Sequence, residues 1–565
     1  MPSQGVDVSS TQTAAPPVLE TDVLVAGGGP CGLMTALELG RRGVRCMVVD
    51  PKPGTAFNPQ ANATQARTME HFRRHGLAEE IRRSGLLPDH PTDIAYFTRF
   101  TGHELARLRL PTAAQAMDMV KTLDGAWSSA ELPHRVSQKF VEAALLRKAK
   151  SYPSNDMRYG WALQSFTDHG THIDASIQPI SSEPAVAVRA KYLVGADGAR
   201  SMVRTQLGIG MAGATGIKRD FMGGRMFAVY LSAPEFYEVM PHDRAWMYVS
   251  FNPQRRAFMA TVDGQGEFAF HAAVHEDEDP HGWTDVDAKR VFREAMGCDI
   301  PIDVLSCGTW LAGHSLYAER FQTGRVFIGG DAAHLFTPTG GLGYNTAIDD
   351  AVNLGWKLAH VIQGVAPEAL LDTYEKERKP LAVRNTGYAR QFADSVGLLV
   401  AAPELEDDTP QGQAARAQAA QRLDEHVRLE FNIPGITFGG RYDASPIVVK
   451  DGTAPPPDHP SIYQPTACPG GRPPHQWMAD GTSLYDAFHG EWTLLVLDDA
   501  QRATAQYVQQ AQRLGLDLKV LNVSCAELRQ RYEAPMALIR PDHIVAWRGQ
   551  SYDDSVLNVV SGRAP

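Results

Sequence analysis

A cluster of glycines near the N-terminus constrains this chain more than any other feature. Residues 27–32 read GGGPCG and lie between an apolar run at 22–27 and a segment, 30–42, whose leucines recur at helical spacing. Residues 44–49 then predict a second strand. A strand–helix–strand unit of this kind normally belongs to a parallel sheet.

The glycines fit the GxGxxG pattern of a dinucleotide site. Gly27 permits the tight turn, Gly29 lets a pyrophosphate approach the backbone, and Gly32 lets the helix pack closely on the strand. The free N–H groups at the start of the helix favour phosphates. Asp50 closes the second strand, where its carboxylate can accept ribose hydroxyls. The pattern predicts dinucleotide binding rather than a ligand-free turn, but it does not choose between FAD and NAD.

Two later motifs bear on that choice. Residues 193–204 read LVGADGARSMVR, so that a predicted strand runs into Asp197. Residues 329–345 read GGDAAHLFTPTGGLGYN, with Asp331 at a strand end and a glycine-rich loop before a helix expected from Thr346. An aspartate there can hold a ribityl hydroxyl, and the loop N–H groups at 340–343 can stabilise negative charge on a reduced flavin.

Composition excludes several functions. The 565 residues suggest three or four structural units, and the net charge of −11 argues against a dedicated binder of nucleic acid or anionic membrane. No apolar run approaches a membrane span, and residues 1–20 resemble a flexible tail rather than a signal peptide. The six cysteines form no CxxC pair and no zinc-ligand spacing with histidine, so we expect reduced thiols, no metal and a cytoplasmic protein.

The rest of the chain alternates between α/β and antiparallel patterns. Strand-like runs between about 157 and 270 predict a mostly antiparallel sheet inserted into the α/β framework. Residues 403–422 read as exposed helix or linker, and proline and glycine at 451–475 indicate a domain boundary. Further elements are expected as a helix at 136–150 capped by Ser137, a strand at 324–330, a helix at 371–400, a strand at 492–497, a helix at 503–515, and a late strand pair within 536–548.

Together these motifs resemble those of the flavin-dependent aromatic hydroxylases, the class A flavoprotein monooxygenases with the para-hydroxybenzoate hydroxylase fold. The likeness runs from about 20 to 400 and includes ARTMEHF (66–72), RVSQKFVE (135–142), AERFQTGRVFIGGDAAH (318–334) and LDTYEKERKP (371–380). The end of the chain, at 469–488 and 537–548, resembles the thioredoxin-like domain of the phenol hydroxylase branch.

The resemblance implies an α/β fold: a Rossmann-like FAD-binding domain, an inserted, mostly antiparallel substrate domain and a C-terminal thioredoxin-like domain. We expect the discontinuous FAD-binding domain at 21–400, the insertion at about 85–120 and 205–310, a helical or linker segment at 401–465 and the thioredoxin-like domain at 466–565. Without a CxxC pair, a redox role for that last domain is improbable. In the family it contributes to packing and oligomer contacts, and a homodimer is expected.

The resemblance also assigns residues to the cofactor. The pyrophosphate turn comprises Gly27, Gly29, Pro30, Cys31 and Gly32, and Asp50 binds the adenosine ribose. Arg67 and Gln138 lie on helices that face FAD, Asp331 holds the ribityl chain, and Asp197 with Arg204 positions flavin and NAD(P)H. The residues expected to line the isoalloxazine are Pro338, Gly341, Leu342, Gly343, Tyr344 and Asn345.

The sequence departs from the family where the substrate should bind. Relatives often carry arginine where this chain has Gln60, and some phenol hydroxylase relatives place a base where it has Asn62. Asparagine cannot take a proton at neutral pH, so Asn62 is a candidate substrate contact rather than a base. Other polar candidates on the inserted sheet are Arg225, Tyr230, Tyr248 and His271. We expect packing roles for Met226, Trp246, Trp310, His334 and Trp356.

The resemblance implies an FAD-dependent monooxygenase. NADPH or NADH reduces the flavin, O₂ gives a flavin C4a-hydroperoxide, and a small phenolic compound is hydroxylated ortho or para to its hydroxyl. The alternatives are a larger aromatic polyketide-type substrate or a non-catalytic flavin-binding scaffold. A missing second GxGxxG argues against Baeyer–Villiger and N-hydroxylating enzymes, and a missing WxWxI argues against halogenases.

Overall fold

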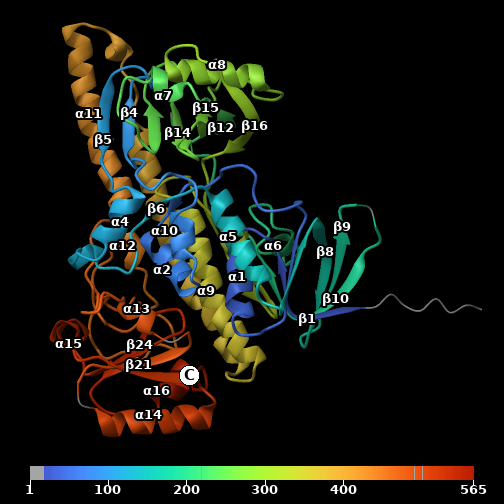
Figure 1. Ribbon diagram of the computed structural model, residues 1–565. Helices are drawn as coiled ribbons and strands as arrows, with labels where there is room; N and C mark the ends of the chain where they lie inside the picture. The colour runs from blue at the N-terminus through green and yellow to red at the C-terminus, as the bar shows by residue number, and fades with distance from the viewer. Residues whose placement is uncertain are drawn as a thin grey trace, which may run out of the picture.

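The computed structural model describes residues 18–181, 183–217, 219, 221–488, 490–498 and 500–564, and its layers are drawn in Figure 1. The flexible tail predicted for residues 1–20 therefore lies mostly outside the described residues. Its last two residues, Leu19 and Glu20, instead begin the first strand of the central sheet.

The first layer is a largely parallel sheet around β1 (Leu19–Ala26). Its apolar strands are buried because helices cover both faces, which is the rule for parallel sheets. Helix α1 (Pro30–Gly40) packs against both α5 (Gln138–Lys150) and α9 (Leu342–Ile362). The other strands, in spatial order, are β18 (Gln322–Thr323), β19 (Val326–Ile328) and β10 (Val186–Gly195) on one side of β1, and β2 (Cys46–Asp50) and β7 (Asn155–Tyr159) on the other.

The predicted start of the inserted sheet, at about 157, is wrong. Strand β7 pairs in parallel with β2, and β10 pairs in parallel with β1. Between them, β8 (Trp161–Asp168) and β9 (Ile173–Pro179) form a hairpin that adds to the same sheet through β10. The hairpin alternates between exposed and buried residues, which is why its sequence reads as antiparallel.

The second layer is a seven-stranded sheet, at the top of Figure 1. One face packs under helix α8 (Asp285–Met296), with Phe227, Met259 and Phe270 in the shared core. The opposite face turns toward α10 and α11. The strand order is β16 (Asp303–Leu311), β12 (Arg225–Ser232), β15 (Glu267–Ala273), β14 (Ala257–Thr261), β13 (Met247–Ser250), β4 (Ile94–Phe97) and β5 (Glu104–Leu108).

Two long helices connect the layers. Helix α9 (Leu342–Ile362) begins four residues earlier than predicted, and α10 (Thr373–Gly397) packs beside it. The segment expected as exposed helix or linker forms helix α11 (Pro410–Phe431), which lies against β5 and α10. Its buried side chains, among them Leu423 and Val427, join the core of the seven-stranded sheet.

The C-terminal domain has a four-stranded mixed sheet, as a thioredoxin-like unit requires. Strand β21 (Trp492–Val496) pairs in parallel with β22 (Leu518–Asn522) and antiparallel with β23 (Met536–Ile539), which pairs with β24 (Val545–Gly549). Trp492 meets Trp356 of α9 edge to face at 5.8 Å, so the domain packs directly on the α9 helix. The predicted fold class is thus confirmed.

The remaining helices are short or peripheral, and none of the described helices is both long and apolar enough to cross a bilayer. The helices are α1 (Pro30–Gly40), α2 (Ala66–Arg74), α3 (Ala78–Arg82), α4 (Ala113–Met119), α5 (Gln138–Lys150), α6 (Met202–Gln206), α7 (Phe236–Val239), α12 (Pro434–Phe438), α13 (Leu484–Ala487), α14 (Gln501–Leu514), α15 (Ala526–Tyr532) and α16 (Val556–Val560). The minor sheets join β3 (Ala63–Thr64) to β6 (His134–Arg135), and β11 (Met211–Ala214) to β17 (Ser315–Ala318) and β20 (His334–Leu335).

Candidate active site

The glycine turn has the geometry that close phosphate approach requires. Gly27 has φ +108°, and a Cβ there would lie 2.1 Å from the Ala196 carbonyl oxygen. A Cβ on Gly32 would lie 1.9 Å from the Gly27 oxygen, whereas Gly29 faces open space. Gly27 and Gly32 therefore have no room for a side chain, whereas Gly29 leaves the backbone open to a ligand.

Asp50 supports this turn from the end of β2. One carboxylate oxygen accepts a hydrogen bond from the Gly28 N–H at 2.7 Å, and the other accepts from Lys52 N–H at 2.8 Å. Tyr159, which the sequence did not single out, donates to the Gly28 carbonyl at 2.8 Å and packs against that glycine. Each Asp50 oxygen keeps one lone pair for a ribose hydroxyl.

Cys31, at the start of α1, lies against a second glycine pair. Its side chain is in contact range of the Cβ positions of Gly329 and Gly330 at the end of β19. Burial raises the pKa of the Cys31 thiol well above its usual value. The thiol is thus a packing group that lets the two nucleotide motifs approach each other.

Asp197 and Arg204 hold a turn together. The Asp197 carboxylate accepts hydrogen bonds from the Ser201 hydroxyl at 2.5 Å and from Val203 N–H at 3.1 Å, so it supports the first turn of α6, whose N-cap is Ser201. Arg204 donates to the Ala332 carbonyl at 3.0 Å. This contact fixes the 330–332 turn, which carries Asp331, against the 197–204 segment.

Asp331 is different from the other aspartates of the motifs. Its side chain is exposed, and it has no hydrogen-bond partner within the part of the chain that the structure describes. The surrounding protein keeps water from its carboxyl, and this desolvation raises the pKa of the group. The neighbouring His334 opposes that shift. A carboxylate held at a strand end without a protein partner is available to a ligand hydroxyl.

The glycine-rich loop ends in a helix rather than continuing to Asn345. Gly340 and Gly341 both have left-handed φ values, +63° and +64°, and α9 begins directly after them. Leu342, Gly343, Tyr344 and Asn345 are therefore its first turn, which is a correction to the predicted loop. The free N–H groups and dipole of a helix start favour negative charge, as the loop was expected to do.

Asn345 anchors this turn to strand β3. Its amide nitrogen donates to the Ala63 carbonyl at 2.9 Å, and its oxygen accepts from Gln65 N–H at 2.8 Å. A Cβ on Gly341 would lie 2.8 Å from that of Ala63. The start of α9 and strand β3 thus meet directly.

Two polar side chains around this contact, Asn62 and Ser137, have a buried oxygen without a hydrogen-bond partner among the residues described. The buried hydroxyls of Thr64 and Tyr344 lie against each other. Unsatisfied buried polar groups are rare in folded proteins and need an explanation. A flavin, whose edge carries N–H and C=O groups, could satisfy such atoms, and Ser137 occupies the predicted cap position of α5 without making a cap bond. The residues present therefore fit bound FAD, and Pro338, in the loop before α9, is exposed.

Gln138 lies at the first position of α5, but its amide turns along that helix. It donates to Glu142 at 2.6 Å, and Glu142 accepts the Ala56 N–H at 2.7 Å. Glu142 is buried, and the sequence analysis missed it because a glutamate at mid-helix usually faces solvent. The pair ties the loop after β2 to helix α5.

Arg67, expected on a helix that faces FAD, turns its guanidinium to the C-terminal domain. Its guanidinium donates to the carbonyls of Asp542 and His543, at 2.8 and 3.1 Å, and to Glu70 at 3.1 Å. Residues 67, 70 and 74 lie on one face of α2 by helical spacing. The C-terminal domain covers that face, so the arginine belongs to an interface between domains.

The candidates on the seven-stranded sheet divide by strand alternation. Arg225 is exposed and shares its side of β12 with Phe227, which packs under α8, so it points away from the flavin side. Tyr248 is buried on that same face, where its hydroxyl accepts the Ala245 N–H at 2.7 Å. Neither residue is placed to contact the substrate.

His271 and Trp310 lie on the opposite face. His271 stacks on Phe258 at 4.6 Å between centroids, and the Trp310 indole donates to His271 Nδ1 at 3.3 Å. Trp310 is half-buried rather than a core residue, which corrects its expected role. Burial lowers the pKa of His271 to about 4, so it is neutral at pH 7.

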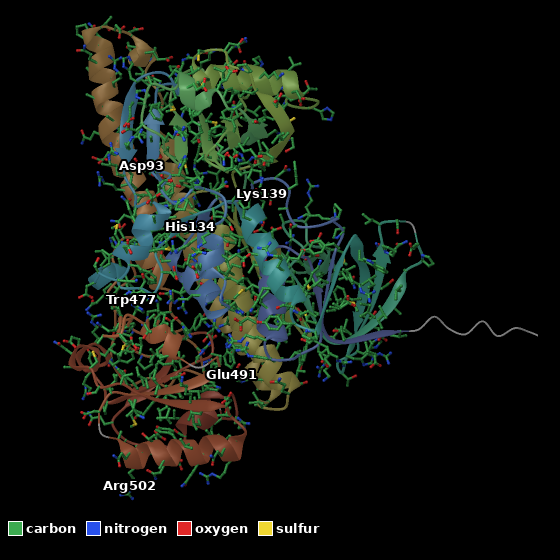
Figure 2. All side chains as sticks on the ribbon, viewed as in Figure 1. Asp93, His134, Lys139, Trp477, Glu491 and Arg502 are labelled. Carbon is green, nitrogen blue, oxygen red and sulfur yellow. The ribbon has the colours of Figure 1, made fainter. Side chains whose placement is uncertain are left out.

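Tyr230 also lies on this face and joins the sheet to α5. Lys139 donates to its hydroxyl at 2.6 Å and lies 3.2 Å from Glu267, to which Tyr230 donates in turn. Burial and Glu267 raise the pKa of Tyr230 above its usual value. Figure 2 shows Lys139 at the boundary between α5 and the sheet, where this network links the two layers.

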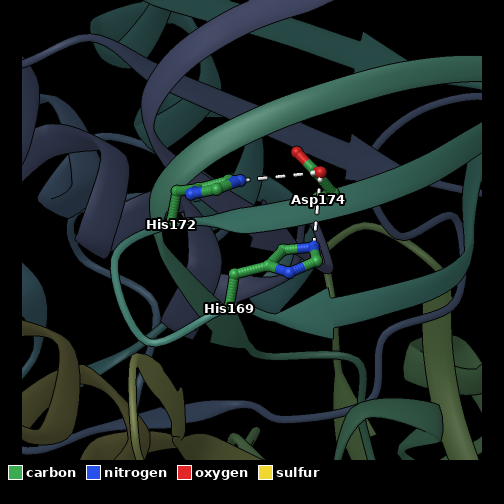
Figure 3. A group of neighbouring side chains, drawn as sticks. All are labelled: His169, His172 and Asp174. Carbon is green, nitrogen blue, oxygen red and sulfur yellow. Dashed lines mark ion pairs between the residues drawn. The ribbon is translucent and has the colours of Figure 1, made fainter.

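A group of metal-type ligands lies elsewhere, on the β8–β9 hairpin. His169, His172 and Asp174 bring their ligand atoms within 4.8 Å of one another (Figure 3). Arg189 also holds the Asp174 carboxylate, at 2.8 and 3.1 Å, and compensates its charge. None of its three residues belongs to the nucleotide motifs at 27–32, 193–204 and 329–345, and no ligand spacing in the sequence indicated the cluster.

Comparison with known proteins identifies the family. The family model for the FAD binding domain matches residues 20–388, and the model for the C-terminal domain of aromatic-ring hydroxylases matches residues 466–563. Phenol 2-monooxygenase of Pseudomonas sp. (strain EST1001) is 30% identical over 586 residues, which covers 96% of this chain and 93% of that relative. Aklavinone 12-hydroxylase RdmE of Streptomyces purpurascens is 30% identical over 558 residues, 94% of this chain and 95% of the relative.

Solved structures give the same result. RebC, in the structure soaked with chromopyrrolic acid and holding 7-carboxy-K252c, is 32% identical with a TM-score of 0.87 over 97% of this chain and all of that one (100%). The ternary complex of aklavinone-11 hydroxylase with FAD and aklavinone is 28% identical with a TM-score of 0.80, covering 97% and 100%. The nucleotide site, the sheet above it and the C-terminal domain thus recur together, and the chain belongs to the family of FAD-dependent aromatic-ring hydroxylases.

Proposed function

We propose that this enzyme hydroxylates a phenolic compound ortho or para to its hydroxyl, using O₂ and NADPH or NADH. The observation that carries the proposal is the position of one apolar core. That core joins the inner face of the seven-stranded sheet to Ala63, and Ala63 contacts Gly341 at the start of α9. An aromatic ring held against that face would lie next to the predicted isoalloxazine site.

The chain's own residues supply binding and exclusion of water. The glycine turn at 27–32, Asp50 and Asp331 would hold FAD, and the start of α9 would favour negative charge on the reduced ring. When bound, FAD supplies electron transfer from NAD(P)H and activation of O₂. The apolar core keeps water from the site, which favours hydroxylation over release of peroxide.

The size of the substrate divides the proposal in two. A small phenol is our first candidate, and phenol 2-monooxygenase and 2,4-dichlorophenol 6-monooxygenase are among the relatives. A larger polycyclic substrate is the second, supported by the likeness to RebC and to aklavinone-11 hydroxylase in their solved structures. We further propose a homodimer in the cytoplasm.

The test is oxidation of NADPH and of NADH by the FAD-loaded enzyme, with peroxide quantified, across small phenols and polycyclic phenols. We expect one class to stimulate oxidation with little peroxide and to yield a hydroxylated product. Stimulation with peroxide alone would identify an effector rather than a substrate. A purified protein that binds no FAD, or that shows no stimulation by any phenol, would contradict the proposal.

A further inference from the structure

Arg135, on strand β6, is a buried cation without an ion pair. Its exposed fraction is only 6%, and its Nη1 is buried with no hydrogen-bond partner. Within the described ranges, its guanidinium has no side-chain hydrogen bond to a carboxylate, and Glu430 acts on it only through its charge. A buried charge that lacks a partner costs several kcal/mol, so such a group normally has a function.

The position of Arg135 joins three parts of the candidate active site. Its backbone pairs with Ala63, the residue that contacts Gly341. Its guanidinium lies over the ring of Trp246 from the seven-stranded sheet, at 4.7 Å, and over Phe431 of α11, at 5.4 Å. Figure 2 shows the neighbouring His134 below that sheet, near the centre of the molecule. The cation therefore lies where the sheet, α11 and the start of α9 converge.

The charged groups around Arg135 are otherwise engaged. Glu430, on α11, accepts the Gly340 N–H at 2.7 Å and pairs with His426 at 2.9 Å. The His426 ring is hydrogen-bonded to the Ser395 hydroxyl at 2.6 Å. The ring of Tyr96, on β4, meets the His426 ring with their centroids 6.1 Å apart. Burial lowers the pKa of Arg135 to about 10, and Glu430 opposes that shift. Arg135 thus stays charged at neutral pH, and Glu430 acts on it only through its charge, without a hydrogen bond or ion pair within 4.0 Å among the described residues.

We propose that Arg135 binds the ionised hydroxyl oxygen of the aromatic substrate. The inference rests on the proposed hydroxylase function, and it supplies what Asn62 cannot. A neighbouring cation lowers the pKa of a phenol, so the phenol enters as phenolate and its proton passes to the buffer. Charge on that oxygen makes the ring carbons ortho and para to it more nucleophilic, without a base in the site.

The surroundings of Arg135 suit an aromatic ring that carries a charged oxygen. Its buried Nη1 has two N–H groups and no acceptor among the described residues, so it can donate to one oxygen of such a ligand. The rings of Trp246 and Phe431 flank the guanidinium, and they offer apolar surface to an aromatic ring carrying that oxygen.

The experiment uses 4-nitrophenol as the probe, because its ionised form is yellow and its neutral form is not. The FAD-loaded enzyme is titrated with the probe at several pH values, and difference spectra report both affinity and ionisation. We expect the wild type to bind the probe as phenolate at a pH where the free probe is mostly neutral. In Arg135→Met the bound probe should become neutral and bind about 10- to 100-fold more weakly, the effect of losing one charged hydrogen bond.

Arg256→Met is the matched control. Arg256 is equally buried and lies over Phe221 and Phe251, but its terminal nitrogens donate to the Leu399 and Val396 carbonyls. This variant should lose stability yet bind the probe as phenolate. Arg135→Lys, which keeps the charge, should retain part of the ionisation even if Arg135→Met folds poorly.

Several results would overturn the assignment. The first is a wild-type enzyme that binds the probe in its neutral form or does not bind it. The second is that wild type and both Arg135 variants give equal spectra. The third is that benzoate competes with the probe in the wild type and no longer competes in Arg135→Met. The last result would assign Arg135 to a carboxylate instead. Phenol-stimulated NAD(P)H oxidation, measured on the same samples, reports separately on the proposed hydroxylase function.

Discussion

At the scale of single residues, the aspartates of the nucleotide motifs have different duties. Asp50 and Asp197 are hydrogen-bonded to backbone N–H groups, whereas Asp331 has no partner among the residues described. The sequence motifs assign all three to the cofactor. The structure shows that Asp50 and Asp197 also support turns of the protein, whereas the Asp331 carboxylate is left entirely to a ligand.

We predict that Asp331→Ala weakens FAD binding by at least about 10-fold, since one charge-assisted hydrogen bond is worth about 1.5–3 kcal/mol. The free energy of unfolding of the apoprotein should stay unchanged, because no internal bond is lost. Asp197→Ala is the control: it removes the acceptor of the Val203 N–H in the first turn of α6 and should lower that free energy by about 1 kcal/mol. Fluorescence titration with FAD and denaturant unfolding measure the two effects, and undiminished FAD affinity in Asp331→Ala would refute its role.

The sequence predicted the residues of the nucleotide turn because each has a local reason, such as the φ of +108° at Gly27. Arg67 and Arg135 show the limit of that reasoning. Arg67 lies in the first turn of α2 and Arg135 ends β6, yet one contacts the C-terminal domain and the other has no ion pair under the sheet among the described residues. Contacts between residues hundreds of positions apart decided both, and no local pattern reports them.

At the scale of elements, helix α11 departs most from its sequence. Alanine and glutamine predominate in its first half, which indicated exposed helix or linker. Its second half buries Leu423, His426, Val427 and Glu430 against the seven-stranded sheet and α10. A four-residue spacing carries that buried face, but charged residues interrupt it, and the hydrophobic pattern is therefore weak.

We predict that α11 supports the loop that ends at Gly341. Glu430→Ala would leave the buried Gly340 N–H without an acceptor, at a cost of about 1–3 kcal/mol, and should loosen FAD binding as well. Glu425→Ala, at an exposed position on the same helix, should change neither property. Thermal unfolding with and without FAD gives the comparison. Equal melting temperatures for both variants would show that α11 is dispensable to the loop.

At the scale of the whole molecule, buried ion pairs attach the C-terminal domain to the FAD-binding domain. Arg472 donates to Glu70 of α2, at 3.0 and 2.5 Å, with both side chains almost fully buried. Arg540 likewise bonds Glu377 of α10, at 2.6 and 2.9 Å. The proline and glycine content of the sequence indicated a domain boundary, but it does not predict the ion pairs that hold the two domains together.

Glu70 makes this attachment pH-dependent. Burial works to raise its pKa, but Arg472 outweighs that effect and lowers the pKa from 4.5 to about 2. A carboxylate with a lowered pKa in the folded state stabilises the protein above its unfolded pKa, and that contribution disappears as the pH falls. The stabilisation, about 3 kcal/mol from the shift, should therefore be complete above pH ~4.5 and lost toward pH ~2.

We expect Glu70→Gln to lower the free energy of unfolding at pH 7 by about 3–5 kcal/mol, because it leaves Arg472 buried without its anion. Between pH ~4.5 and ~2 the variant should lose less stability than the wild type. Asp486→Asn removes a half-exposed pair with Arg73 at the same domain contact, and should cost less than about 1 kcal/mol. Denaturant unfolding across this pH range measures all three proteins. Parallel pH profiles for wild type and Glu70→Gln would mean that the pair does not set acid stability, and the domains would then be held by their apolar contact at Trp356 and Trp492.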